Sequence, residues 1–386
     1  MNKFNASLVT RATVSLLVLL STAWSMGSVA SGRLAASAFR TCYALDGGGI
    51  KCWGDGVNVP FSVPESASRF VSTDAGALGS HFCALTDGNA AQCFGQNFQY
   101  QLGDGTANGR SNPESVVGLE SSVGQVVAGT YGGCALAGGG VFCWGLSYVS
   151  LDNINGLAVE KTGFLSQPVE ITVGHDHQCV RTAMGTVQCW GSNHSGQLGN
   201  ASTTTTQTPQ TVVGLPGPAV RVDAGVGATC AIVSGGALYC WGNNQFGQLG
   251  VGNFNNASIA SPVQGLSSGV IDVAVGDHHT CAILAGGTVR CWGFDSSGQV
   301  GNGPSKPPSG DLGFKSPQQV LGIVGAESIA TGMFFSCAGL GNDRVTCWGD
   351  NEDGQLGDGT NMNRDAPSGV LELSSLAARI FYSGFQ

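Results

Sequence analysis

Charged residues are scarce in this chain. Asp, Glu, Lys and Arg make up 11% of its 386 residues, and 25 acidic residues outnumber 16 basic ones. No cluster of basic residues stands out, so the composition argues against nucleic acid or an anionic membrane surface as a partner. Helical periodicity is absent beyond the N-terminal segment. Short apolar stretches divided by Gly, Asn and Pro favour an all-β fold instead.

Long apolar runs are also missing, with one short exception that ends at Ala23. Basic residues precede this run, and Ser28-Val29-Ala30 places small residues at a cleavage position. The pattern predicts a signal peptide over residues 1–30, cleaved near Ala30, and a secreted, periplasmic or cell-surface protein. An uncleaved anchor is the alternative, but the run is shorter than the ~20 residues of a spanning helix, so we expect no stable membrane insertion. Cleavage would remove Lys3 and Arg11 and no acid, which changes the net charge from −9 to −11.

An unpaired cysteine is lacking too. The fourteen cysteines form seven pairs, six of them ten positions apart and one nine. The pairs are Cys42 with Cys52, Cys83 with Cys93, Cys134 with Cys143, Cys179 with Cys189, Cys230 with Cys240, Cys281 with Cys291 and Cys337 with Cys347. Six of the second members open the tripeptide Cys-Trp-Gly, and Cys93-Phe94-Gly95 fills the remaining slot. In an exported chain, such pairs are expected to be disulfides.

Seven copies of one unit indicate a repeat architecture. The first cysteines follow one another at 41, 51, 45, 51, 51 and 56 positions, and each unit contains four short apolar stretches. We expect four strands per unit, with the cysteine pair on opposed positions of the central hairpin. Each bridge would stabilise the fold by about 2–3 kcal/mol.

Three repeated features predict how the strands of a unit are arranged and how units pack together. The first stretch of most units ends in small residues, as in Ala224-Gly225, and we therefore place this strand innermost. The recurring tryptophans, such as Trp241, suit a buried contact between units rather than a ligand platform. Gly-Gln-Leu-Gly segments such as Gly247–Gly250 predict a tight turn that buries a leucine, and not a phosphate loop, because no Lys or helix follows.

A zinc site is the alternative to a purely structural interpretation of these units. His81, His177 and His279 each stand two residues before a first cysteine. Zinc sites bring cysteines together at closer spacing or add a second histidine cluster, so we interpret these histidines as structural and expect neither a metal nor a cofactor.

The units resemble the repeats of the regulator-of-chromosome-condensation family. The match rests on the His-x-Cys strand, the Trp-Gly strand and the Gly-Gln-Leu-Gly turn, and it is clearest at residues 171–199, 222–250, 272–301 and 328–359. The resemblance implies a seven-bladed β-propeller over residues 31–386, with about fifty residues per blade. Family members serve as a nuclear exchange factor, as modules of signalling proteins, and as secreted β-lactamase inhibitors, so the fold alone does not name an activity.

Some units depart from this pattern. The first keeps only Asp55-Gly56-Val57-Asn58 in place of the turn, and the third has Leu146-Ser147-Tyr148-Val149. The sixth carries an insertion over residues 302–315. Ser374–Tyr382 looks like the first strand of an eighth unit, and the sequence leaves open which terminal strand closes the ring.

Our main hypothesis is an exported, non-enzymatic and monomeric binding protein that recognises an extracellular or envelope protein, or a surface glycan, through loops on one face. The candidate loops are residues 97–112, 146–165, 200–209 and 302–315. Their aromatic residues are candidate exposed anchors, with gap filling as the alternative: Phe98, Tyr100, Tyr148 and Phe314.

Two alternatives remain. A lyase or hydrolase at the central channel would need a histidine and acids that converge, and the sequence offers only His194, Asp152, Glu160 and Glu170. A β-lactamase-inhibitor-like protein fits the topology, but nothing in the loops identifies a target. The sequence leaves the partner, the binding face and the organism open, and with the organism the glycosylation of Asn193, Asn200 and Asn256.

Overall fold

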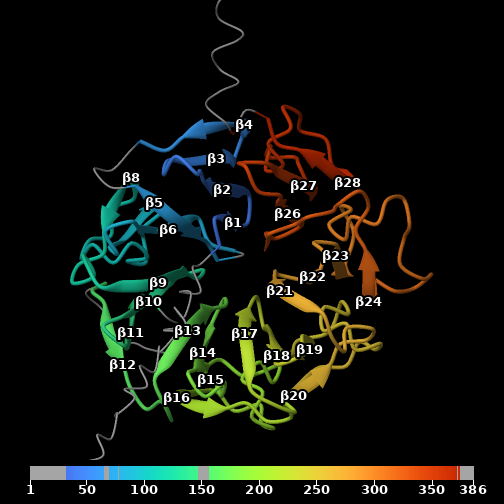
Figure 1. Cartoon of the computed structure of the whole chain (residues 1–386), viewed down its shortest axis with the longest axis horizontal. Coiled ribbons are helices and arrows are strands. Elements are labelled where there is room, and N and C mark those ends of the chain that lie inside the picture. Colours follow the sequence, from blue (N-terminus) through green and yellow to red (C-terminus); the bar gives the residue numbers. More distant parts are fainter. Residues whose placement is uncertain (1–31, 65–68, 77, 147–155, 372, 374–386) are drawn as a thin grey trace, which may run out of the picture.

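Seven four-stranded antiparallel sheets surround a central axis in the computed structural model, which describes residues 32–64, 69–76, 78–146, 156–371 and 373 (Figure 1). The predicted seven-bladed β-propeller is therefore confirmed. The predicted signal peptide lies outside the described residues. Within the described part of the chain, no helix is long and apolar enough to cross a membrane.

Each blade uses four consecutive strands. In chain order they are β1 (Leu34–Ala36), β2 (Arg40–Ala44), β3 (Ile50–Gly54) and β4 (Val57–Ser62) in blade 1; β5 (Phe70–Asp74), β6 (His81–Thr86), β7 (Ala91–Gly95) and β8 (Arg110–Ser115) in blade 2; β9 (Val123–Ala128), β10 (Gly132–Ala137), β11 (Gly140–Gly145) and β12 (Val159–Lys161) in blade 3; β13 (Pro168–Val173), β14 (His177–Thr182), β15 (Val187–Gly191) and β16 (Thr206–Thr211) in blade 4; β17 (Ala219–Ala224), β18 (Ala228–Val233), β19 (Ala237–Gly242) and β20 (Ala257–Pro262) in blade 5; β21 (Val270–Val275), β22 (His279–Leu284), β23 (Val289–Phe294) and β24 (Gly313–Gln319) in blade 6; and β25 (Ser328–Thr331), β26 (Phe335–Gly339), β27 (Val345–Gly349) and β28 (Arg364–Gly369) in blade 7.

One disulfide joins the two central strands of every blade. The two cysteines of a pair stand directly opposite one another in the hairpin, and their Cα atoms are 4.0–4.1 Å apart. In blade order, the bonds join Cys42 to Cys52, Cys83 to Cys93, Cys134 to Cys143, Cys179 to Cys189, Cys230 to Cys240, Cys281 to Cys291 and Cys337 to Cys347. The predicted pairing is confirmed for all fourteen cysteines, and it indicates an oxidising environment.

The first strand of each blade is innermost, as predicted (Figure 1). The inner strands end so close together that Gly76 lies against Gly129, and a Cβ on Gly225 would overlap the carbonyl oxygen of Gly276. Only glycine fits such a backbone approach. The small residues at these strand ends are therefore a steric requirement of the ring.

Neighbouring blades are joined by what we call the Gln-Leu turn. It occurs in five blades: Gln101-Leu102, Gln197-Leu198, Gln248-Leu249, Gln299-Val300 and Gln355-Leu356. In each, the aliphatic side chain is fully buried. In four, the glutamine carbonyl accepts a hydrogen bond of 2.8–3.0 Å from the tryptophan Nε1 of the next blade. The predicted contact of tryptophan between units is confirmed, and the turn is its partner.

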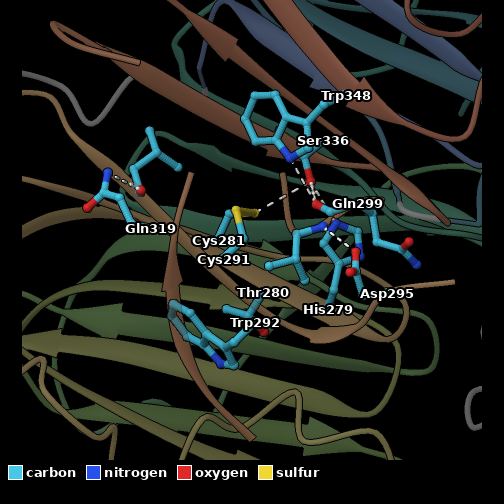
Figure 2. Close-up of a disulfide and its surroundings, with 12 residues drawn as sticks. His279, Thr280, Cys281, Cys291, Trp292, Asp295, Gln299, Gln319, Ser336 and Trp348 are labelled. Atoms are coloured by element: carbon cyan, nitrogen blue, oxygen red, sulfur yellow. Dashed lines mark hydrogen bonds between the residues drawn. A yellow bond between two sulfur atoms is a disulfide. The ribbon is translucent and has the colours of Figure 1, made fainter. Parts of the chain in front are cut away.

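Figure 2 shows this contact between blades 6 and 7. Gln299 O accepts from Trp348 Nε1 at 2.9 Å and from Ser336 Oγ at 3.0 Å. Because the single hydroxyl hydrogen of Ser336 is used in this way, His279 Nε2 donates to that hydroxyl at 2.8 Å. His177 and Thr229 repeat the arrangement at 2.8 Å between blades 4 and 5. These two histidines therefore have a structural role between blades.

A buried asparagine holds the turn in shape. Asn193 Nδ2 donates to Asn200 Oδ1 and to two loop carbonyls, and its Oδ1 accepts from Leu198 N at 3.0 Å. Asn97, Asn244 and Asn351 do the same in their blades. Since Asn193 is fully buried, this glycosylation candidate is inaccessible in the folded protein.

The ring closes by packing between its two ends. Blade 1 takes its inner strand from β1, and Gly357 of the blade 7 turn lies against Trp53 of blade 1. Gln355 O accepts from Thr41 Oγ1 at 3.1 Å across the same interface. Among the described residues, no strand is exchanged between the ends. The predicted extra strand at Ser374–Tyr382 lies outside them.

One face of the ring carries most of the irregular chain. Because neighbouring strands are antiparallel, loops from first to second strand and from third to fourth strand emerge at the same end of a blade. We call this side the loop face. The described parts of the four candidate loops belong mainly to connections between third and fourth strands, and therefore lie on the loop face.

Candidate functional site

Two of the seven interfaces lack the Gln-Leu turn. In blade 1, a two-residue hairpin, Asp55-Gly56, joins β3 to β4, and both residues have positive φ (56° and 86°), as in a type I′ turn. In blade 3, the chain leaves β11 at Leu146 and returns at β12 without the motif. Each of these two interfaces has a cavity on the loop face.

The interface between blades 1 and 2 has compensated for the loss. Where blades 1, 5, 6 and 7 have a hydroxyl and a tryptophan, blade 2 has Phe82 and Phe94, whose rings stack at 5.7 Å. These rings put carbon where a hydroxyl and an indole N–H stand in blades 1, 5, 6 and 7.

A cavity of about 480 Å³ remains beside this ring pair. Phe39 (42% exposed) and Phe98 (78% exposed) line it. Arg40 also lines it and pairs with Asp55 at 2.7 Å. The site therefore combines aromatic side chains with a charge pair, and Arg40 Nε is buried there without a hydrogen-bond partner.

The interface between blades 3 and 4 has kept the receptor for the turn. Trp190 is 3% exposed and lines a cavity of about 260 Å³. Neither its Nε1 nor the carboxamide of Gln178 has a hydrogen-bond partner among the described residues. Gln178 stands at the position of Thr229 and Ser336 in the repeat. Trp53 Nε1 also lacks an acceptor, but Gly357 covers that ring, whereas Trp190 faces the cavity.

Polar and charged groups surround this second cavity. Lys161 Nζ lies 5.6 Å from the centre of the Trp190 ring and donates to Gln207 O at 2.6 Å. Phe164 packs against the same indole at 5.6 Å. Glu160 also lines the cavity, so the Lys and Glu side chains among its described lining residues are opposite in charge.

A third feature of the loop face is a row of aromatic residues over blades 5 to 7. Phe246 contacts His278 at 4.5 Å and Phe294 at 4.9 Å, and Phe294 contacts Phe334 at 5.9 Å between ring centres. All four side chains are partly exposed. They come from loops and, for Phe294, from the end of β23, on the same face as the two cavities.

The predicted anchor residues have different outcomes. Phe98 is exposed at the rim of the first cavity, and Tyr100 is partly buried beside Gly156. Phe314 lies in β24, is 8% exposed and packs into the core, so the expectation that it is exposed was wrong. Residues 313–319 form a strand rather than the end of the insertion. Tyr148 lies outside the described residues.

The residues considered for an enzyme are dispersed. Glu160 is at the second cavity, Glu170 is buried in the inner strand β13, and His194 is exposed on a repeat turn. No hydrogen bond among the described residues joins these three. Asp152 lies outside them.

The channel has its own charge network. Arg221 pairs with Asp272 at 2.5 Å and with Glu170 at 3.7 Å. Burial raises the pKa of Asp74 to about 7 and that of Asp223 to about 6, although each accepts a backbone hydrogen bond from the next blade. These acids satisfy the unpaired edges of inner strands, which explains their burial.

Metal ligands do not gather in the described part of the chain, where no group of three or more His, Cys, Asp or Glu side chains could hold an ion. Burial lowers the pKa of His177 to about 4 and that of His279 to about 3. Both rings are therefore neutral at ordinary pH.

Sequence reasoning missed Trp190 and Gln178 as a site. The repeat pattern groups Trp190 with the other tryptophans as a core contact. The signal was present, since the third unit loses its turn while the fourth keeps its tryptophan. It becomes visible only when each unit is compared with the next one.

The chain is thus a propeller of seven units, and five of its seven blade interfaces combine a Trp-Gly strand with a Gln-Leu turn. The RCC1-like domain matches residues 23–384, and the chain belongs to this family. It is 28% identical to the ultraviolet-B receptor UVR8 of Arabidopsis thaliana over 309 residues, which are 75% of this chain and 68% of that protein.

Two further similarities fit this assignment. The human E3 ubiquitin-protein ligase HERC2 is 30% identical over 212 residues, 53% of this chain but only 4% of that protein. The yeast RCC1 protein Prp20, solved bound to Kap60, superposes with a TM-score of 0.73 at 20% identity, covering 98% of this chain and 92% of that one. The structural likeness concerns the fold alone.

Proposed function

We propose that this protein is an exported, non-enzymatic scaffold that binds a partner protein of the cell envelope or exterior with its loop face. Seven hairpin disulfides support export, because such bridges persist in oxidising compartments. The observation that carries the proposal is that both lost turns open cavities on the same face. The aromatic row of blades 5 to 7 lies on that face as well.

The physical argument concerns surface chemistry. Protein interfaces are enriched in aromatic residues and Arg at their centres. The first cavity offers Phe39, Phe98 and Arg40 in this combination. Loops on a rigid scaffold are the usual place for such recognition. Here each blade is fixed by a disulfide, so the loop face is held in shape before a partner arrives.

A matched pair of variants tests the proposal. Phe98→Asp changes a residue that is 78% exposed on the loop face, and Met184→Asp changes one that is 77% exposed on the opposite face. Quantitative mass spectrometry of envelope and secreted proteins captured on the immobilised chain should show a partner lost with Phe98→Asp and kept with Met184→Asp. Equal capture by both variants, or capture that disappears after periodate treatment of the glycans, would contradict a protein-binding loop face.

A further inference from the structure

We infer that the cavity between blades 3 and 4 is a receptor for a peptide turn, which a partner protein supplies with a small aliphatic side chain and a backbone carbonyl. This inference rests on the proposed function and specifies the chemistry of one contact. At the five other interfaces, the tryptophan of one blade packs against the Gln-Leu turn of the preceding blade. These contacts show which ligand such a tryptophan binds.

The donor at this site is in place. At blades 5, 6 and 7, the indole N–H gives its hydrogen bond to the glutamine carbonyl of the preceding turn. Trp190 holds the same repeat position and is only 3% exposed. Its Nε1 lacks an acceptor among the described residues, and the side chain lines the cavity. A peptide carbonyl is the group that this position binds elsewhere in the molecule.

The remaining walls favour an uncharged, partly apolar ligand. Trp144, Val173 and Val159 provide apolar surface, and Gln178 provides a carboxamide that has no partner among the described residues. The rim charges, on β12, are one positive and one negative. A turn with a leucine or valine fits these walls better than an anion or a cation does.

The interface between blades 1 and 2 acts as an internal contrast. There Phe82 and Phe94 occupy the positions that hold donors in blades 1, 5, 6 and 7. Between blades 3 and 4 the turn is missing but the donors Trp190 and Gln178 are present. A cavity of about 260 Å³ holds several times the ~30 Å³ of one water molecule, so there is room for a side chain and its carbonyl.

The chain supplies its own probe. Gly242 and Ala257 are paired across β19 and β20, so residues 243–256 can be cyclised with little change in the turn that they form. This cyclic peptide is titrated into the full-length oxidised protein labelled with ¹⁵N-tryptophan. We expect a saturable shift of the Trp190 indole signal, which is assigned by its loss in Trp190→Phe. The same peptide with Asp in place of Leu249 should bind at least about tenfold more weakly.

Three results would overturn the inference: no shift of the Trp190 indole, equal shifts of several indoles, or binding that is seen only after residues 147–155 are replaced by Gly and Ser. The first measurement uses the unmodified chain, so a folding defect in Trp190→Phe cannot imitate any of them. The titration needs no natural partner. If the titration gives no shift but Phe98→Asp still loses the partner, only this inference is refuted. If the Trp190 signal shifts but Phe98→Asp and Met184→Asp capture the same proteins, only the proposed function is refuted.

Discussion

The interface between blades 1 and 2 and the interface between blades 3 and 4 have both lost the turn that fills the others, but with different consequences. In the first, stacked Phe82 and Phe94 replace the receptor. In the second, Trp190 and Gln178 remain and face a cavity. The difference shows that a missing turn in one blade can be interpreted only together with the next blade. The residues there that would contact the turn decide whether a site remains. Where the receptor is replaced, no site for a turn remains at the interface, whereas an intact receptor without its turn is a candidate site for a turn from another protein.

The largest test of this comparison replaces tryptophans. Trp241→Ala should lower the free energy of unfolding by about 3–5 kcal/mol, because the ring is fully buried under an intact turn. Trp190→Ala should cost about 1–2 kcal/mol less, since a cavity already lies beside that ring. Urea denaturation with all disulfides intact measures both values. Equal losses would mean that the turn adds nothing to the packing of its tryptophan.

The asparagine of the turn gives the next largest effect. Asn244→Ala should cost about 2–3 kcal/mol, because its side chain donates to Asn253 O and Asn255 O and accepts from Leu249 N while fully buried. Asn255→Ala, on the exposed part of the same loop, serves as the control and should change stability by less than about 0.5 kcal/mol. If the two variants were alike in thermal and urea unfolding, the asparagine would not hold the turn.

Blade 6 offers a change that should stabilise the protein. Asp295 stands where the other turns have asparagine, and its Oδ2 and Asn302 Oδ1 are both buried without a hydrogen-bond partner. In blade 4, the corresponding pair is bonded, from Asn193 Nδ2 to Asn200 Oδ1. Asp295→Asn should therefore raise stability by about 1–3 kcal/mol at pH 7.

The stability gain from Asp295→Asn should depend on pH. Burial raises the pKa of Asp295 to about 6, above its ordinary value of 3.8 and against a hydrogen bond from Val300 N. The folded protein thus holds this proton more tightly, and stability from Asp295 is lost as the pH rises from about 4 through 6. The gain from Asp295→Asn should shrink toward pH 4. A gain that does not depend on pH would contradict the assignment.

Features that lie within a single repeat could be predicted from the sequence. Seven equally built units with a cysteine pair each specified blades, hairpins, disulfides and the innermost strand, because each of these depends on residues within one unit. Phe314 was misjudged because the insertion before it resembles a loop, although β24 begins at Gly313. The cavity at Trp190 was missed for a different reason. It depends on a turn in one unit and a receptor in the next, a contact that no single repeat contains.

The smallest expected effect concerns which disulfide a reductant reaches first. Cys134 and Cys143 line the cavity at Trp190, and Cys143 is partly exposed, whereas Cys230 and Cys240 are fully buried. Thiol–disulfide exchange requires access of the attacking thiolate to a sulfur atom. Brief treatment of the native protein with a small thiol, followed by alkylation and peptide mapping, should therefore label Cys134 and Cys143 before the other twelve cysteines. The cyclic turn peptide should slow this labelling, because it would cover the same sulfur atoms, and the Leu249→Asp peptide should not. Labelling of all seven pairs at one rate would show that the whole protein must open before any bridge reacts, and that losing the turn of blade 3 has not exposed its disulfide.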